Sequence, residues 1–207
     1  LPSDLMRSSV KTNSGTTQSF KVEKETADGL NELSRQQGST LFMTLLSAFN
    51  VLLYRYSGQS DISVGTSITN RPQQEIENLI GFFVNTLALR SEVSNDITFK
   101  EFIQQVKQTT LDAYSHQEVP FEKVVDAVVK DRDPGRSPLF QVMLVLHNTP
   151  EVPQLQLGGV RMSTEAFENN VSKFEITFFV NETPNGLMIS VQYRSDLYSE
   201  RMISRMT

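Results

Sequence analysis

Side chains that could carry chemistry are few in this sequence, and no catalytic centre can be recognised from them. The two histidines, His116 and His147, lie far apart, and no His-x-x-x-His pair or acidic cluster has the spacing of metal ligands. Cysteine is absent, which excludes a thiolate nucleophile and a disulfide framework. Neither a glycine-rich phosphate loop nor a Gly-x-Ser-x-Gly nucleophile turn occurs. What polar side chains in this sequence could still offer is hydrogen bonding to a bound molecule.

Asn85 is the first candidate for such a binding role. Its side-chain amide can both donate and accept hydrogen bonds, and it follows Phe82 and Phe83, an aromatic pair that could wall a substrate channel. Ser67 and Thr66 are weaker candidates for the same wall, and they lie just before a predicted turn. All of these side chains could contact a substrate without supplying a base.

Structural explanations compete with each functional one. Adjacent aromatics such as Phe82 and Phe83 more often fill a packed interior, and Gly81 could simply permit a tight turn. Asn85 could equally cap backbone groups at a strand junction. His116 lies at a predicted helix end before a proline, where an imidazole often satisfies the last carbonyls, so a structural role is favoured.

The helices that must position these residues follow from hydrophobic spacing. Apolar residues at helical spacing predict an amphipathic surface helix over residues 23–37 and a largely buried helix over residues 40–53. Residues 98–129 again have helical spacing, with a break at Pro120 that separates a longer helix from a shorter one. One more helix begins at Ser199.

The strands follow from alternation of apolar and polar residues. His147 closes one of them and could point to either face. Residues 183–186 would form the turn between the last two strands. The predicted strands are residues 61–69, 84–93, 139–146, 160–167, 174–180 and 187–193. Together with the helices they predict a mixed α/β fold, in which helices pack on a sheet.

Composition limits the class of protein further. The 207 residues are 38% hydrophobic and 21% charged, which is typical of a compact globular protein. A net charge of -5 leaves no basic face for a nucleic-acid backbone. The longest apolar run, residues 41–54, is interrupted and too short to span a bilayer, so no membrane association is expected. The absence of cysteine is consistent with a cytoplasmic protein.

Three unusual strings of residues occur in order along the chain. They are Ile80-Gly81-Phe82-Phe83-Val84-Asn85-Thr86-Leu87-Ala88-Leu89-Arg90, His116-Gln117-Glu118-Val119-Pro120-Phe121-Glu122-Lys123-Val124-Val125 and Arg132-Asp133-Pro134-Gly135-Arg136-Ser137-Pro138-Leu139-Phe140-Gln141-Val142-Met143. Shorter strings flank them, namely Val64-Gly65-Thr66, Asn70-Arg71 and Lys173-Phe174-Glu175. Together these strings resemble the signature motifs of condensation domains of nonribosomal peptide synthetases. The resemblance covers essentially the whole chain.

The resemblance implies a fold of two lobes, each similar to chloramphenicol acetyltransferase, around a central tunnel. The family's His-His-x-x-x-Asp-Gly motif belongs to the N-terminal lobe, and no such string occurs here. The chain would therefore be the C-terminal lobe (residues 19–207), preceded by a Ser/Thr-rich linker from the missing N-terminal lobe (residues 1–18). Because the chain begins without methionine and stops within a helical pattern, we expect it to be a piece of a longer protein. Alone, it should be inactive.

The reaction implied by the resemblance is amide bond formation between carrier-bound aminoacyl or peptidyl thioesters. Each substrate is tethered to the 4'-phosphopantetheine arm of a carrier protein, and no cofactor would bind this chain directly. Alignment of the two reactants alone can lower such a barrier by about 7–11 kcal/mol. The implied partners are the missing lobe, the upstream and downstream peptidyl carrier proteins, and the adjacent adenylation domain.

The resemblance also suggests which residues bind substrate. Those in the tunnel wall would be Gly81, Phe82, Phe83, Asn85, Thr86, Thr66 and Ser67. His116, Arg136, Ser137 and Gln141 would contact the carrier arm or serve the structure. For Arg136, a buried ion pair that fixes a loop is favoured over a contact with the arm.

Two alternatives to amide formation remain open. Epimerization, cyclization and ester-forming relatives share the fold, although the motifs are more similar to those of peptide-forming members. The chain could also belong to a non-catalytic platform that recruits a partner enzyme to the assembly line.

Overall fold

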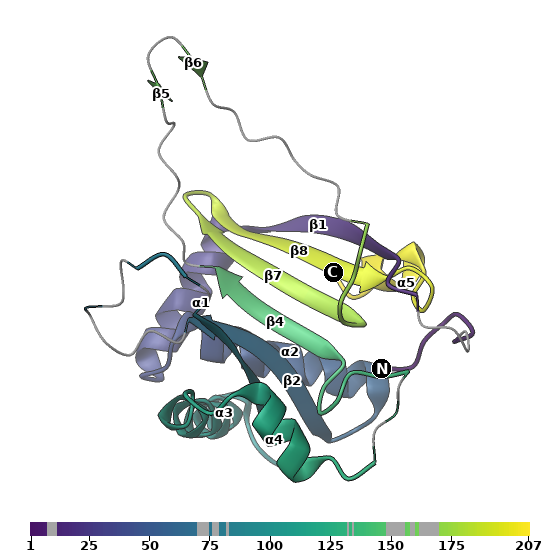
Figure 1. Cartoon of the computed structure of the whole chain (residues 1–207). Coiled ribbons are helices and arrows are strands. Elements are labelled where there is room, and N and C mark those ends of the chain that lie inside the picture. The colour runs from purple at the N-terminus through teal and green to yellow at the C-terminus, as the bar shows by residue number, and fades with distance from the viewer. Residues whose placement is uncertain are drawn as a thin grey trace.

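The computed structural model describes residues 1–7, 12–69, 75, 79–81, 83–131, 133, 135–147, 156–157, 160–161 and 170–207. Its centre is a six-stranded mixed sheet in the order β1-β8-β7-β4-β2-β3 (Figure 1). The strands are β1 (Gly15–Glu23), β2 (Asp61–Thr69), β3 (Val84–Glu92), β4 (Val142–His147), β7 (Ile176–Thr183) and β8 (Gly186–Arg194). A separate antiparallel pair consists of β5 (Gln156–Leu157) and β6 (Val160–Arg161). This architecture confirms the predicted mixed α/β fold.

Strand direction brings several strand ends together at one edge of the sheet. β2, β4 and β7 run parallel to one another, whereas β3 and β8 run antiparallel to their neighbours. The carboxyl ends of β2, β4 and β7 therefore lie at the same edge as the start of β3. At that edge Thr69 pairs with Val84, and His147 ends β4.

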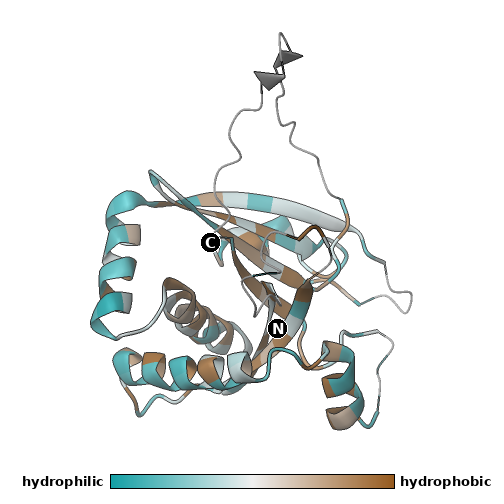
Figure 2. Ribbon diagram, turned by 60° about the vertical axis from the view of Figure 1, so that its left-hand side comes forward, coloured by the Kyte–Doolittle hydropathy of each residue, from teal (hydrophilic) through white to brown (hydrophobic). Residues whose placement is uncertain are grey.

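Three helices cover one face of the sheet, and the other face is largely open. Figure 2 shows α1 (Lys24–Gln36), α2 (Leu41–Ser57) and α3 (Phe99–Ser115) on one side of the strands. As predicted, α2 is the buried helix, because its apolar residues occupy most of its circumference. No helix in the described ranges is long and apolar enough to cross a membrane. The main hydrophobic core lies between these helices and the sheet, and its buried residues include Leu46, Val64, Leu89, Ile176 and Val191.

A smaller apolar cluster lies on the opposite face, beneath α4 (Phe121–Val128). The ring of Phe140 is its centre, with ring centroids 5.5 Å from Phe121 and 5.4 Å from Phe174. A Cβ atom at Gly65 would lie 2.2 Å from the Phe140 ring, so only glycine lets β2 approach this ring so closely. The predicted break at Pro120 is confirmed, since α4 begins at the next residue.

The N-terminal residues are tied to the far end of the chain. Arg7 forms an ion pair with the buried carboxylate of Glu175 at 2.7 Å, and the Tyr198 hydroxyl donates to the same carboxylate at 2.9 Å. The backbone N–H of Ser199 donates to Asp4 at 3.0 Å. Ser199 also caps α5 (Glu200–Ser204), the helix predicted to begin there.

Two local predictions differ from the structure. The predicted linker includes residues 15–18, but these form the first half of β1 and pair with β8. β1 is an edge strand with mostly exposed or half-buried residues, so its apolar alternation is weak. The strand predicted at residues 139–146 begins only at Val142, after Leu139 adopts a φ of 65°. Of the strand predicted at 160–167, Val160–Arg161 is β6, and residues 162–167 lie outside the described part of the chain.

Candidate functional site

The open face of the sheet carries two cavities that meet at one cross-strand pair. Ser67 on β2 pairs with Thr86 on β3, and strand alternation turns both side chains away from the helix-covered face. Ser67 lines a cavity of about 470 Å³ and Thr86 lines a second cavity of about 510 Å³. Both volumes are in the range of small-molecule sites. We name them the His147 cavity and the Lys173 cavity after one lining residue of each.

The His147 cavity lies at the edge where β2 and β4 end. Its apolar wall is contributed by neighbouring strands, and its polar groups come from β2, β4 and the end of α3. The His147 ring lies 5.7 Å from the ring of Phe179 on β7, which supports it from the side. The polar lining residues are Ser67, Thr69, Tyr114, Gln117 and His147.

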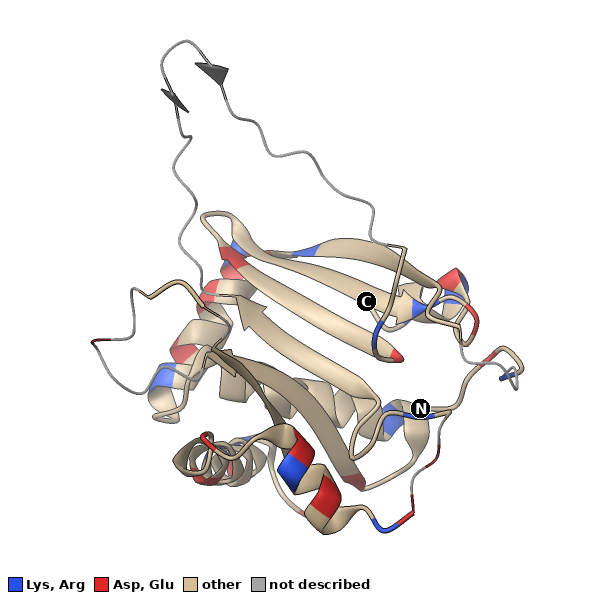
Figure 3. Ribbon diagram, in the orientation of Figure 1, with Lys and Arg blue, Asp and Glu red and all other residues tan. Residues whose placement is uncertain are grey.

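The Lys173 cavity has an aromatic floor and charged walls. Phe121 and Phe174 line it, and both pack on Phe140 beneath. Lys173 Nζ lies 5.5 Å from the centroid of the Phe174 ring, in a cation–π contact. Figure 3 shows charges of both signs on α4 beside this cavity, whereas β4 and most of β2 carry none. The remaining polar lining residues are Thr86, Glu122, Asp126 and Ser137.

Asn85 joins the walls of the two cavities, and its amide is fully used in doing so. The amide nitrogen donates to the carbonyl oxygens of Gln117 at 2.6 Å and Val119 at 2.8 Å. The amide oxygen accepts from the backbone N–H of Thr86 at 2.8 Å and of Phe121 at 3.3 Å. Asn85 therefore pins the α3–α4 connection to β3, and these bonds favour the structural alternative for this residue.

Of the glycine and aromatic candidates before β3, the described residues Gly81 and Phe83 line neither cavity. Gly81 is exposed, and a Cβ atom there would lie 2.7 Å from the half-buried Phe83 ring, so glycine permits this contact. Phe82 lies outside the described residues. Thr66 is only 3% exposed and pairs with the core residue Leu87, because alternation directs it to the helix-covered face. The structure thus does not bring Thr66 to the wall with Ser67.

The residues predicted to contact the carrier arm or to serve the structure mainly hold loops and helix ends in place. His116 ends α3, and its Nδ1 donates to the carbonyl of Asp112 at 2.9 Å, in agreement with the structural alternative. Gln141 Nε2 donates to the carbonyl of Ser137 at 3.0 Å, which fixes the loop that leads into β4. Only Ser137 of this group lines one of the two cavities.

Arg136 differs from the prediction of a buried ion pair. Its side chain is 57% exposed, and its Nε lies 3.7 Å from the carboxylate of Asp133, three residues earlier. An exposed pair with this separation fixes a loop only weakly. The prediction of burial is therefore wrong, because the loop before β4 lies on the surface.

Sequence reasoning does not single out three polar residues of the His147 cavity, and it leaves the direction of His147 open. Tyr114 lies in the last turn of α3 and Gln117 follows in the α3–α4 connection, and both are brought to the sheet edge only in the folded chain. Burial raises the pKa of the Tyr114 hydroxyl. A usable signal exists for His147, because its spacing from Met143 and Val145 places all three on one face of β4.

Comparison with known proteins places this arrangement in a family. The sequence profile described as "Condensation domain" matches residues 1–207. A linear gramicidin synthase of Brevibacillus parabrevis is 47% identical over 210 residues, and bacitracin synthase 1 of Bacillus licheniformis is 39% identical over 207 residues. Each alignment covers 100% of this chain but only 3% and 4% of those synthases.

A solved structure shows the same fold. The chain superposes on holo-AB3403, a four-domain nonribosomal peptide synthetase bound to AMP and glycine, with a TM-score of 0.91 and 26% identity. That match covers 99% of this chain and 17% of the other. The profile over the full length and the shared fold agree with the order of the three sequence strings. This chain belongs to the condensation domain family of nonribosomal peptide synthetases.

Proposed function

We propose that this chain is the C-terminal lobe of a condensation domain that forms amide bonds between carrier-bound aminoacyl or peptidyl thioesters. The observation that carries the proposal is the pair of cavities that meet at Ser67 and Thr86 on the open face of a condensation-family fold. Cavities on an uncovered sheet face suit a tunnel that a second lobe completes. The division into a linker and a lobe belongs to this proposal, with the lobe beginning by Gly15, because residues 15–18 are part of β1.

The chemistry requires one nucleophilic attack. The amine nitrogen of the acceptor attacks the carbonyl carbon of the donor thioester, so that a C–N bond forms and the C–S bond breaks. The amine loses a proton and the departing thiolate of the donor arm gains one. Neither described histidine is followed or preceded by a second histidine, so the base of the His-His-x-x-x-Asp-Gly motif would come from the other lobe.

The contribution of this lobe is alignment of the reactants. The hydroxyl groups of Ser67 and Thr86 stand at the junction of the cavities, where they can hydrogen-bond to a substrate carbonyl or amine. Asn85 acts as a positioning residue, because it holds Gln117 in the α3–α4 connection and Phe121 at the start of α4. Correct alignment can supply several kcal/mol of barrier reduction without a base, up to about 7–11 kcal/mol in total.

The proposed partners follow from the tethered substrates. They are the N-terminal lobe, the upstream and downstream peptidyl carrier proteins with their 4'-phosphopantetheine arms, and the adjacent adenylation domain. Ser137 and Arg136 lie on one loop beside the Lys173 cavity, where a carrier arm could pass. A cytoplasmic location remains the expectation for a cysteine-free chain.

The test compares the complete two-lobe domain with this chain alone. Both substrates are loaded on their carriers, and the amide product is followed in single-turnover reactions by mass spectrometry. We expect product from the complete domain and none from the chain alone. No product from the complete domain would favour the non-catalytic platform, and an ester or epimerised product would favour the corresponding relative.

A further inference from the structure

Polar side chains without an internal hydrogen bond gather in the described part of the His147 cavity. Its five polar side chains, those of Ser67, Thr69, Tyr114, Gln117 and His147, form no hydrogen bond to any other side chain or backbone group in the described part of the chain. Groups that fold into a concave site without an internal partner are available to a ligand.

The described residues that line the cavity carry no formal charge. They include no Asp, Glu, Lys or Arg, and β4, which contributes Val145, Leu146 and His147, is uncharged in Figure 3. Moving a charged group from water into such surroundings is costly once the proposed second lobe covers the cavity, unless a counter-charge is present. An uncharged group that carries hydrogen-bonding atoms meets no such cost.

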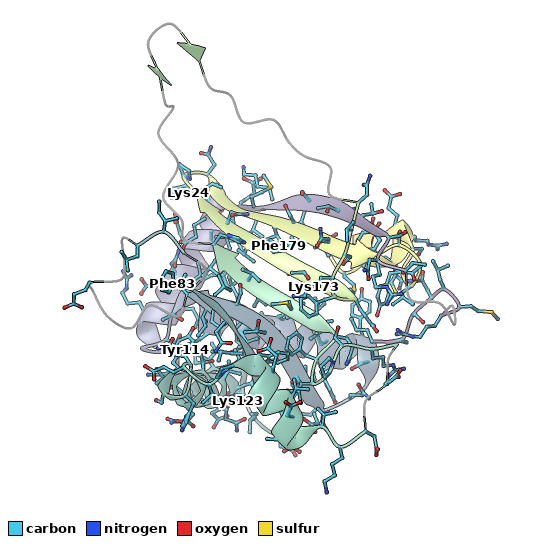
Figure 4. All side chains as sticks on the ribbon, viewed as in Figure 1. Lys24, Phe83, Tyr114, Lys123, Lys173 and Phe179 are labelled. Atoms are coloured by element: carbon cyan, nitrogen blue, oxygen red, sulfur yellow. The ribbon has the colours of Figure 1, made fainter. Side chains whose placement is uncertain are left out.

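The polar groups are held in place before any ligand arrives. Asn85 fixes the backbone of Gln117 through its hydrogen bond at 2.6 Å. The His147 ring rests against Phe179, and Tyr114 projects from the last turn of α3, as Figure 4 shows for the labelled Tyr114 and Phe179. Preorganised groups select among ligands because little ordering is needed on binding.

We propose that the His147 cavity binds an uncharged, hydrogen-bonding side chain or amide of one carrier-bound substrate. Tyr114 and His147 are its specificity-determining residues. The inference rests on the proposed function and adds the class of substrate group that this lobe selects. A site with directed hydrogen-bonding groups discriminates against an analogue that lacks the matching atoms, because those groups are then left unpaired.

The experiment uses the complete domain and substrates that differ only in one side chain. Glutaminyl, leucyl and lysyl groups are loaded first on the acceptor with a fixed donor, and then on the donor with a fixed acceptor. For wild type, kcat/KM for the glutaminyl substrate should exceed that for the other two in one of these arms. The arm that shows the preference identifies which substrate enters the cavity.

Two variants test the roles of the residues. Tyr114→Phe should reduce the preference for glutaminyl over leucyl substrate by about tenfold, since one hydrogen bond is lost. His147→Asp places a carboxylate in the cavity and should raise the lysyl over glutaminyl ratio by about tenfold. Asn31→Asp is the matched control, because Asn31 is exposed on α1 and lines neither cavity, so the same charge is introduced elsewhere and both ratios should stay unchanged.

A binding measurement separates this inference from the proposed function. The imidazole signals of His147 in the complete domain, assigned with His147→Asn, are followed by NMR as glutaminyl- or lysyl-pantetheine is added. Shifts with the glutaminyl compound alone support the inference even where no amide forms, in which case only the proposed function fails. The inference would be overturned if the ratios of kcat/KM between the substrates were the same in wild type and in all variants. It would also be overturned if the His147 signals shifted with neither compound.

Discussion

Ser67 and Thr86 face each other across β2 and β3, and each lines a different cavity on the open face of the sheet. The linings of the two cavities therefore contain neighbouring residues of one cross-strand pair. A reaction that joins two tethered substrates needs such a meeting point. The predictions below test the residues that build it.

Replacing Asn85 should loosen the wall that both cavities share. Asn85→Ala removes four hydrogen bonds to backbone groups and should lower the free energy of unfolding by about 2 kcal/mol. Asn85→Asp should be at least as destabilising, because its second oxygen would face the carbonyls of Gln117 and Val119. Urea unfolding of the complete domain measures both changes. An Asn85→Asp variant as stable as wild type would show that these bonds do not form.

Gly65 should not tolerate a side chain. Gly65→Ala places a Cβ atom 2.2 Å from the Phe140 ring and should cost about 3 kcal/mol of stability. Phe140→Leu in the same protein should recover part of this loss, since the smaller side chain relieves the clash. Thermal unfolding of the single and double variants gives the coupling free energy between the two substitutions. Strictly additive effects would mean that the two residues do not touch.

The ion pair between buried Arg194 and Asp196 should make the free energy of unfolding depend on pH. Its guanidinium donates hydrogen bonds to Asp196 at 3.0 and 2.6 Å and lowers the pKa of that carboxyl. The stabilisation is therefore fully present above the unfolded pKa of about 3.9 and is lost as the pH falls through the lower folded pKa. Asp196→Asn should cost roughly 1–3 kcal/mol at neutral pH and less in acid.

Urea unfolding over a series of pH values checks this dependence. The control is Asp28→Asn, which removes an exposed pair with Lys24 and should change stability little at any pH. Equal losses for Asp196→Asn at neutral and acid pH would contradict the assigned ion pair.

Much of the fold can be predicted from the sequence, because the spacing of apolar residues indicates the helices and the central strands. The circumference of α2 is apolar, and the break at Pro120 separates α3 from α4. The first half of β1 escapes prediction because an edge strand needs few buried side chains. Its pairing with β8 joins residues far apart in sequence, which no local pattern reveals.

The site is harder to predict, because it depends on which groups remain free after folding. The amide of Asn85 suggests a binding role, yet all four of its hydrogen bonds are formed with nearby backbone groups. Ser67 and Thr86 are separate candidates in the sequence, and only the β2–β3 register shows that they are neighbours. Tyr114 carries no local signal of function, because the approach of α3 to the sheet edge is a tertiary relationship.

The most direct test of the central claim is the rate of amide formation by a Ser67→Ala/Thr86→Val double variant of the complete domain. With carrier-tethered donor and acceptor, we predict a single-turnover rate at least about tenfold lower than wild type, because hydrogen bonds to the aligned substrates are lost. Urea unfolding should show unchanged stability. Ser63→Ala, on the same strand but in neither cavity, should retain the wild-type rate. A double variant that forms amide as fast as wild type would contradict the assignment of this face to the reaction.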